Sequence, residues 1–309
     1  MPESLSRALV LSAPPGRTLR PPLLDAVRAA LLPYPVHGER WLDEDRVHEW
    51  LFAAPDDVPL ATLRGAMTAA VGDPSLDLAV VADDIAVRRR MLLVADMEST
   101  VIEQEMLDEL GDLIGKRGVI EDITERAMRG ELDFEAALDE RVAMLAGLDA
   151  RVLDEVAGRI TLMPGAETLV RTMKAHGAYC ALVSGGFTAF TARVAARLGF
   201  DEHQANVLEV ADGRLTGRVS RPILGRAAKR DALARLAGKL GLAPPLTLAV
   251  GDGANDLDML SAAGLGVAFR AKPKVRAAAA AMANGAVVAH GDLTALLHLQ
   301  GYSTAEFTR

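Results

Sequence analysis

The sequence predicts an α/β protein: a doubly wound parallel sheet with an inserted helical cap, preceded by a small α+β unit. Three observations lead to this prediction. Short continuous apolar runs alternate with helical patterns over the C-terminal two-thirds of the chain, and a long helical stretch separates the first run from the second. The first 87 residues differ, because two helical segments lie there among four short strand-like segments. Strands that alternate with helices are typical of a parallel sheet covered on both faces.

The main unit is expected over residues 91–302, with a Rossmann-like core. Its apolar runs resemble strands buried on both faces and lie at 91–95, 180–183, 246–250, 266–269 and 286–288. Helical patterns separate most of them, at 166–176, 188–198, 227–240 and 255–263. The stretch at about 103–162 is too long for a single crossover, so we expect it to form the cap. Residues 207–219 predict a β-hairpin around Asp212-Gly213.

The amino-terminal unit is expected over residues 1–87. Its order, strand–helix–strand–strand–helix–strand, is the ferredoxin-like split pattern. It resembles small amino-acid-binding or dimerising modules such as ACT domains. This leaves three roles open: binding of a feedback ligand, pairing of two copies into a homodimer, or a structural appendage only. Arg88-Arg89-Arg90 follows the unit, and we interpret it as a solvated linker.

Composition excludes several classes of protein. The formal net charge of −8 argues against nucleic acid and anionic membranes as partners. The single cysteine, Cys180, excludes an internal disulfide, and no histidines fall at the spacings of a zinc site. No apolar run approaches the roughly 20 residues of a membrane span, and the first residues lack the pattern of a signal peptide. We therefore expect a reduced, cytoplasmic protein.

Residues that could form an active site follow the predicted strands. In open α/β sheets the active site forms beyond the carboxyl ends of the strands. The residues expected to meet there are Asp96 and Glu98 after the first strand, Ser184, Gly185 and Gly186 after the second, Asp252, Asn255 and Asp256 after the third, and Lys229 on the preceding helix. Taken singly, each has an ordinary explanation, such as a helix N-terminus, a tight turn or a surface lysine. Their conjunction, in chain order, favours one site.

Such a set supports phosphoryl transfer. A carboxylate can attack phosphorus and form an aspartyl-phosphate. Mg²⁺ held by carboxylates offsets the repulsion between the nucleophile and the phosphate. A lysine, a hydroxyl and glycine N–H groups can hold the remaining phosphate oxygens. A second acid two residues after the nucleophile can protonate the leaving alkoxide and then activate water.

The order Asp-x-acid-Ser-Thr, Ser-Gly-Gly, Lys and Gly-Asp-Gly-x-Asn-Asp resembles the haloacid dehalogenase superfamily and, more narrowly, the phosphoserine phosphatase family. The resemblance covers residues 91 to about 296. It implies Mg²⁺-dependent hydrolysis of O-phospho-L-serine, the last step of phosphorylated serine biosynthesis, with Asp96 as nucleophile and Glu98 as general acid and base. It implies that Asp96, Asp252, Asp256 and the Glu98 carbonyl hold the metal. It also implies that the phosphate is held by Ser184, Gly185, Gly186, Lys229 and Asn255.

The resemblance extends to the cap. It implies that Glu105 binds the substrate ammonium, that Arg141 binds the carboxylate, that Phe134 covers the substrate and that Met128 lines the pocket. Glu98 departs from the family, in which this acid is more commonly Asp. We expect Glu98 to keep the proton-transfer role with some adjustment of its rotamer or backbone. The motifs do not distinguish water from another small alcohol, such as homoserine, as the phosphoryl acceptor.

Overall fold

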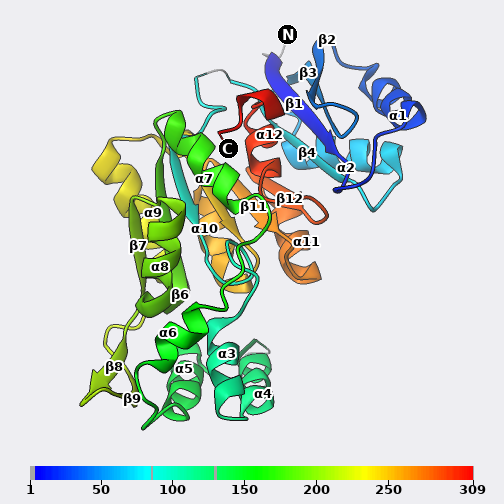
Figure 1. Ribbon diagram of the computed structural model, residues 1–309. Helices are drawn as coiled ribbons and strands as arrows, with labels where there is room; N and C mark the ends of the chain where they lie inside the picture. Colours follow the sequence, from blue (N-terminus) through cyan, green and yellow to red (C-terminus); the bar gives the residue numbers. More distant parts are fainter. Residues whose placement is uncertain (1–3, 85, 129–130, 309) are drawn as a thin grey trace.

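The computed structural model describes residues 4–84, 86–128 and 131–308, without the side chains of residues 125, 127 and 128. The chain forms a core sheet, a cap at the bottom of Figure 1 and an amino-terminal unit at the upper right. The core sheet has six parallel strands in the order β12-β11-β10-β5-β6-β7. Their bounds are β5 (Leu92–Ala95), β6 (Tyr179–Phe187), β7 (Glu202–Asn206), β10 (Thr247–Gly251), β11 (Leu265–Phe269) and β12 (Gly285–Val288).

Helices cover both faces of this sheet. One face packs against α7 (Ala166–Ala175), α8 (Thr188–Leu198) and α12 (Ala295–Leu299). The other packs against α9 (Arg226–Leu240), α10 (Leu257–Ala262) and α11 (Pro273–Ala281). Three short 3₁₀ turns complete the core, η1 (Pro244–Leu246), η2 (Ala254–Asp256) and η3 (Thr304–Glu306). Because the central strands are apolar on both sides, burying both faces stabilises them. The predicted fold class is therefore confirmed.

The sequence patterns did not predict one of the core strands. β7 is a polar edge strand of sequence Glu-His-Gln-Ala-Asn, and it has no continuous apolar run because only one of its edges pairs with the sheet. Edge strands commonly carry polar and charged side chains. The predicted strands at 91–95, 180–183, 246–250, 266–269 and 286–288 all form.

Within its described residues, the cap has four helices, α3 (Met106–Leu113), α4 (Arg117–Met128), α5 (Phe134–Ala143) and α6 (Val152–Ala157). A hairpin of β8 (Leu208–Ala211) and β9 (Arg214–Val219) turns at Asp212 and Gly213, both with positive φ, as the Asp-Gly motif predicts. The hairpin lies beside the cap. Leu215 exchanges backbone hydrogen bonds of 2.8 Å with Gly147 and Leu148. The cap layer is thus built from two separate parts of the chain.

The amino-terminal unit has the predicted order of elements: β1 (Ser4–Ser12), α1 (Pro21–Leu31), β2 (Val36–Asp43), β3 (Val47–Pro55), α2 (Leu60–Val71) and β4 (Asp77–Ala82). Its antiparallel sheet has the order β2-β3-β1-β4. One face of the sheet packs on α1 and α2. The other shares an apolar cluster with the core, in which Ala8 and Val10 join Leu293 and Leu296 beside α12.

The interpretation of Arg88-Arg89-Arg90 as a solvated linker is wrong for two of the three side chains. Arg88 and Arg90 are buried. Arg88 pairs with Glu49 and Asp83, whereas Arg90 donates to the carbonyls of Val87 and Pro245. The sequence could not reveal this, because the burial results from docking of the amino-terminal unit on the core. Among the helices of the described residues, none has the length and apolar character needed to cross a membrane.

Candidate active site

The site begins where two neighbouring strands end. Asp96 directly follows β5 and Asp252 directly follows β10. These strands pair in parallel with Val250 opposite Ala95, and the Asp96 N–H continues the ladder to the Val250 carbonyl at 3.0 Å. The ladder therefore holds the two aspartates side by side at the carboxyl edge of the sheet, as the sequence predicts for parallel strands.

A buried lysine joins the aspartates. Lys229 lies in the first turns of α9, and its Nζ is 2.7 Å from Asp96 Oδ1 and 2.7 Å from Asp256 Oδ1. All three residues are at most 5% exposed. Burial lowers the pKa of Lys229, but the Asp256 and Asp96 carboxylates outweigh it and hold that pKa above its usual value. Lys229 is therefore a fixed positive charge at the site.

The loop after β10 shapes the rest of the acidic cluster. Asp256 accepts a hydrogen bond of 2.9 Å from the Gly253 N–H. A Cβ at Gly251 would lie 2.3 Å from Asp256 Cγ, so this position has room only for glycine. Thr100, which is fully buried, donates to Asp252 at 3.3 Å. The sequence analysis assigned no role to Thr100, although it belongs to the Asp-x-acid-Ser-Thr motif.

The cluster has the donor set of a divalent-cation site. Oxygen atoms of Asp96, Asp252 and Asp256 lie within 4.8 Å of one another. Burial raises the pKa of Asp96 well above its usual range and that of Asp252 to about 7, and the neighbouring carboxylates add to both shifts. Three carboxylates thus face a single lysine in a dehydrated pocket. A hard dication with oxygen ligands supplies the missing positive charge, so these residues fit such an ion.

The Ser-Gly-Gly motif lies within β6, next to Asp96. Ser184 is buried and accepts a 2.9 Å hydrogen bond from the Gly186 N–H. The β6–β7 ladder is interrupted between Val183 and Phe187, so the motif bulges out of the sheet. The bulge exposes backbone groups at the same edge where the carboxylates gather.

The Glu98 side chain packs closely against the Ser-Gly-Gly segment. Its Oε1 accepts a 2.9 Å hydrogen bond from the Met106 N–H at the start of α3. A Cβ at Gly186 would lie 2.8 Å from Glu98 Oε2, so the glycine leaves room for the longer acid. Burial raises the pKa of Glu98 well above its usual range, and the Glu105 carboxylate adds to the shift. Glu98 therefore holds its proton more firmly than an exposed glutamate does.

The cap carries four of the predicted residues, and the structure describes the side chains of three of them. Phe134 packs over the loops of the core, because a Cβ at Gly185 or Gly225 would lie within 3.8 Å of its ring. Arg141 donates to Thr124 Oγ1 at 3.0 Å. Burial lowers its pKa, whereas Glu98, Asp108 and Glu105 raise it. Glu105 accepts a 2.6 Å hydrogen bond from the Ser99 hydroxyl. Arg141 and Glu105 thus lie within electrostatic reach of the site.

The core gathers most of the predicted residues in one place. The core brings Asp96, Lys229, Asp252 and Asp256 into contact or close proximity, with Ser184, Gly185, Gly186 and Glu98 on the adjoining strand end and loop. Asn255 lies on the same loop as Asp252 and is half-buried. Met128 ends α4, but its side chain lies outside the described residues.

A family model for haloacid dehalogenase-like hydrolases matches residues 93–261, more than half of the chain. The chain belongs to the haloacid dehalogenase-like hydrolase family. A haloacid dehalogenase family hydrolase from Salmonella enterica serovar Typhi superposes with a TM-score of 0.82 at 29% identity, covering 95% of this chain and 98% of that one. The shared fold therefore extends over the amino-terminal unit as well as the hydrolase core.

Curated relatives within the family carry a narrower name. A phosphoserine phosphatase from Streptomyces coelicolor is 48% identical over 75% of this chain and 56% of its own length. One from Polaromonas sp. is 44% identical over 73% of this chain and 96% of its own length. The chain spans little more than half the length of the first curated relatives it matches.

Proposed function

We propose that this family member is a Mg²⁺-dependent phosphoserine phosphatase, converting O-phospho-L-serine and water to L-serine and phosphate. The observation that carries the proposal is the buried Asp96–Lys229–Asp256 contact beside Asp252 and the Ser184 loop. The names of the relatives support the choice of substrate. Asp96, Asp252, Asp256 and the Glu98 carbonyl would hold the Mg²⁺, which offsets charge on the phosphate when bound.

Asp96 is the proposed nucleophile. Lys229 and the Met97 N–H both contact its Oδ1, at 2.7 and 2.8 Å, so these contacts fix the carboxylate and leave Oδ2 as the proposed attacking oxygen. Oδ2 forms a bond to phosphorus as the bond from phosphorus to the serine oxygen breaks. The Ser184 hydroxyl, the Gly185 N–H group, Lys229 and Asn255 would hold the phosphate oxygens, whereas the Gly186 N–H would hold Ser184 Oγ in place.

Glu98 is the proposed general acid and base. Its raised pKa favours the protonated form that the first step needs. It gives this proton to the departing serine oxygen. In the second step, water attacks phosphorus, its proton passes to Glu98, and the bond from phosphorus to Asp96 Oδ2 breaks. Asp96 and Glu98 thereby return to their starting forms.

The cap would recognise the amino-acid part of the substrate. Arg141 can hold the carboxylate through its guanidinium fork, and Glu105 can pair with the ammonium. Phe134 would cover the bound substrate and exclude bulk water. Met128 stays a prediction from the family resemblance. So do a cytoplasmic location, the division into units at 1–87 and 91–302 with a cap at about 103–162, and a homodimer formed through the amino-terminal unit.

The test is a substrate panel with two variants. Phosphate release is measured with L-phosphoserine, phosphothreonine and sugar phosphates, with Mg²⁺ and with EDTA. We expect phosphoserine to be preferred and EDTA to abolish release. Asp96→Asn should lower turnover by at least about a thousandfold, whereas Asp57→Asn, an exposed control far from the site, should not. Substantial Mg²⁺-dependent turnover by Asp96→Asn would exclude the aspartyl-phosphate route.

Glu98→Gln removes the proton path while keeping the size of the side chain. We expect turnover to fall roughly a hundredfold or more, the usual contribution of a positioned acid or base. Turnover near that of the wild type would remove Glu98 from the mechanism. Transfer to another alcohol is not favoured by the names of the relatives, and phosphate release with and without added homoserine tests it directly.

A further inference from the structure

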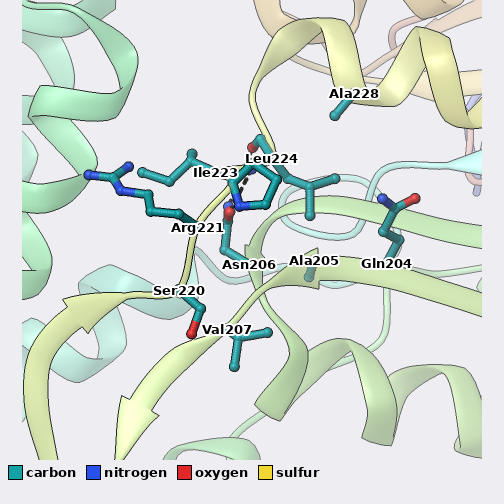
Figure 2. A pocket seen from close by; sticks show the side chains of 10 residues that line it. Gln204, Ala205, Asn206, Val207, Ser220, Arg221, Ile223, Leu224 and Ala228 are labelled. Carbon is teal, nitrogen blue, oxygen red and sulfur yellow. Dashed lines mark hydrogen bonds between the residues drawn. The ribbon is translucent and has the colours of Figure 1, made fainter.

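A buried amide lies at the end of β7, beside the phosphate-binding loop. Asn206 is 2% exposed and its side chain uses both polar ends. Nδ2 donates to the Gly185 carbonyl at 2.8 Å, and Oδ1 accepts from the Leu224 N–H at 2.7 Å. Nδ2 also lies 3.4 Å from the Leu224 carbonyl. Figure 2 shows the dashed bond that joins Asn206 to Leu224, with Arg221 extending away from them.

The Gly185 carbonyl needs this partner because the sheet does not supply one. The β6–β7 ladder pairs Val183 with Gln204 and resumes only at Phe187 opposite Asn206. Three residues on β6 therefore face a single residue on β7. A buried backbone carbonyl in such a bulge must find another donor. The Asn206 side-chain amide donates the hydrogen bond that β7 does not provide to the Gly185 carbonyl.

This contact also sets the direction of a backbone donor. The Gly185 carbonyl and the Gly186 N–H belong to one planar peptide unit, so fixing the carbonyl fixes the N–H. The Gly186 N–H donates to Ser184 Oγ at 2.9 Å. The serine oxygen is thereby used as an acceptor, and its own proton is available to a phosphate oxygen. The orientation of Ser184 thus depends on Asn206 through one peptide plane.

The other end of the amide holds the segment that leads into the Lys229 helix. Leu224 and Gly225 immediately precede α9. The Phe134 ring of the cap packs against both Gly185 and Gly225. Arg221, from the same segment, pairs with Glu135 at 3.2 Å and with Asp139 on α5. The two segments that Asn206 ties together are therefore also the ones on which the cap rests.

We propose that Asn206 is a positioning residue for the phosphate site, which links the Ser184 loop to the segment carrying Lys229 and keeps both at the spacing that a phosphate group requires. It touches neither the substrate nor the reacting atoms. This proposal rests on the proposed function, because its main readout is phosphoserine hydrolysis. Asn206 and Gln204 both line a cavity of about 410 Å³ beside this strand.

The experiment compares Asn206→Ala and Asn206→Asp with Gln204→Ala, a control on the same strand and lining the same cavity. Asn206→Asp keeps the acceptor for the Leu224 N–H but replaces the donor to Gly185 with a second oxygen. For each folded variant, kcat and KM for phosphoserine, the inhibition constant of inorganic phosphate and the melting temperature are measured. We expect both Asn206 variants to raise KM and the phosphate inhibition constant about tenfold, the effect of roughly one lost hydrogen bond.

A purely structural role would lower the melting temperature and leave these two constants within twofold of the wild type, and that result would overturn the proposal. If Asn206→Ala does not fold, the isosteric Asn206→Asp decides alone. A wild-type enzyme without phosphoserine hydrolysis would contradict the proposed function instead. Calorimetric binding of inorganic phosphate with Mg²⁺ then decides the role of Asn206: binding about tenfold weaker in the variants supports it, and equal binding overturns it.

Discussion

The cap and the amino-terminal unit are attached to the same core in different ways. The cap joins the core through two chain segments that lie antiparallel, with Ile102 opposite Leu162. Hydrogen bonds join these two segments beside the buried side chain of Ile102. The Glu103 N–H bonds the Thr161 carbonyl at 3.0 Å, and the Gln104 side chain bonds the backbone of Arg159 and Thr161 at 3.1 and 3.0 Å.

The amino-terminal unit is attached by buried polar contacts as well as an apolar face. Asp77 accepts backbone hydrogen bonds from Ala289, His290 and Gly291 at 2.8 to 3.0 Å. The buried Arg64 donates to the carbonyls of Gly285 and Ala280, next to α11 and β12. Each of these side chains bonds main-chain groups of the core in or next to α11 and β12.

The difference indicates which attachment can open. A narrow hinge of backbone hydrogen bonds allows a layer to move as a body, whereas buried charges that satisfy core peptides resist separation. We infer that the cap opens and closes over the site, while the amino-terminal unit stays docked. Changes at the docked interface should therefore alter stability, and changes at the hinge should alter motion and turnover.

Removing residues 1–87 has the largest expected effect. The truncated chain would expose the side of α12 and its neighbours that shares a cluster with Ala8 and Val10, including Leu293 and Leu296. Because fully burying a leucine contributes about 2 kcal/mol, we expect the unfolding free energy to fall by roughly 5 kcal/mol or more. Urea denaturation of both chains measures this. Equal midpoints would show that the amino-terminal unit does not stabilise the core, which would contradict a docked attachment.

Asp77→Ala tests the docked interface without a truncation. Three N–H groups lose their buried acceptor, so we expect a loss of roughly 3 kcal/mol in the free energy of unfolding, with kcat/KM within twofold of the wild type. Asp56→Ala is the control, since Asp56 is exposed and 4.0 Å from Arg7, and it should cost at most about 0.5 kcal/mol. A loss under 1 kcal/mol in Asp77→Ala would mean that these contacts do not hold the unit.

Gln104→Ala tests the hinge. Its two backbone contacts disappear, and we expect the hinge to open about fivefold more often, equivalent to about 1 kcal/mol. Hydrogen exchange at the Met163 amide, which bonds the Val101 carbonyl across the hinge at 2.9 Å, should accelerate by that factor, and kcat/KM should change severalfold while the urea midpoint moves little. Glu103→Ala, one residue away with an exposed side chain, serves as the matched control. Unchanged exchange in Gln104→Ala would remove this side chain from the hinge.

Asp108→Asn is expected to have the smallest effect on the free energy of unfolding, and it should raise that free energy whereas the other variants lower it. Burial raises the pKa of Asp108 on α3 to about 6, and Glu105 and Glu121 add to the shift. Since the folded pKa lies above the unfolded one, ionisation of Asp108 costs stability progressively as the pH rises from about 4 to about 6. The variant should therefore gain in melting temperature, relative to the wild type, more at pH 7.5 than at pH 4.5. We expect less than about 1 kcal/mol, because the group is half-buried.

Asp122→Asn, an exposed change on α4, should show no such pH-dependent gain. Equal differences from the wild type at both pH values would mean that Asp108 carries no raised pKa in the folded protein.

The sequence predicted the parts of the molecule in which local pattern and tertiary position agree. The core strands were found because they are apolar on both faces, and the convergence of Asp96, Asp252 and Asp256 followed from the parallel arrangement. The polar strand β7 was missed, and with it Asn206, because an edge strand has no apolar run and a single asparagine has no motif. The burial of Arg88 and Arg90 depends on a docked partner surface that no local pattern reveals.

The two-part construction of the cap layer has a consequence for protein engineering. The hairpin of β8 and β9 bonds the segment after α5, yet more than fifty residues lie between the two, most of them in the core. A chimera that exchanges only the stretch from α3 to α6 with a relative would leave Leu215 facing a foreign backbone. A transplantable specificity module must therefore include both segments, together with Arg221, which pairs with Glu135 and Asp139.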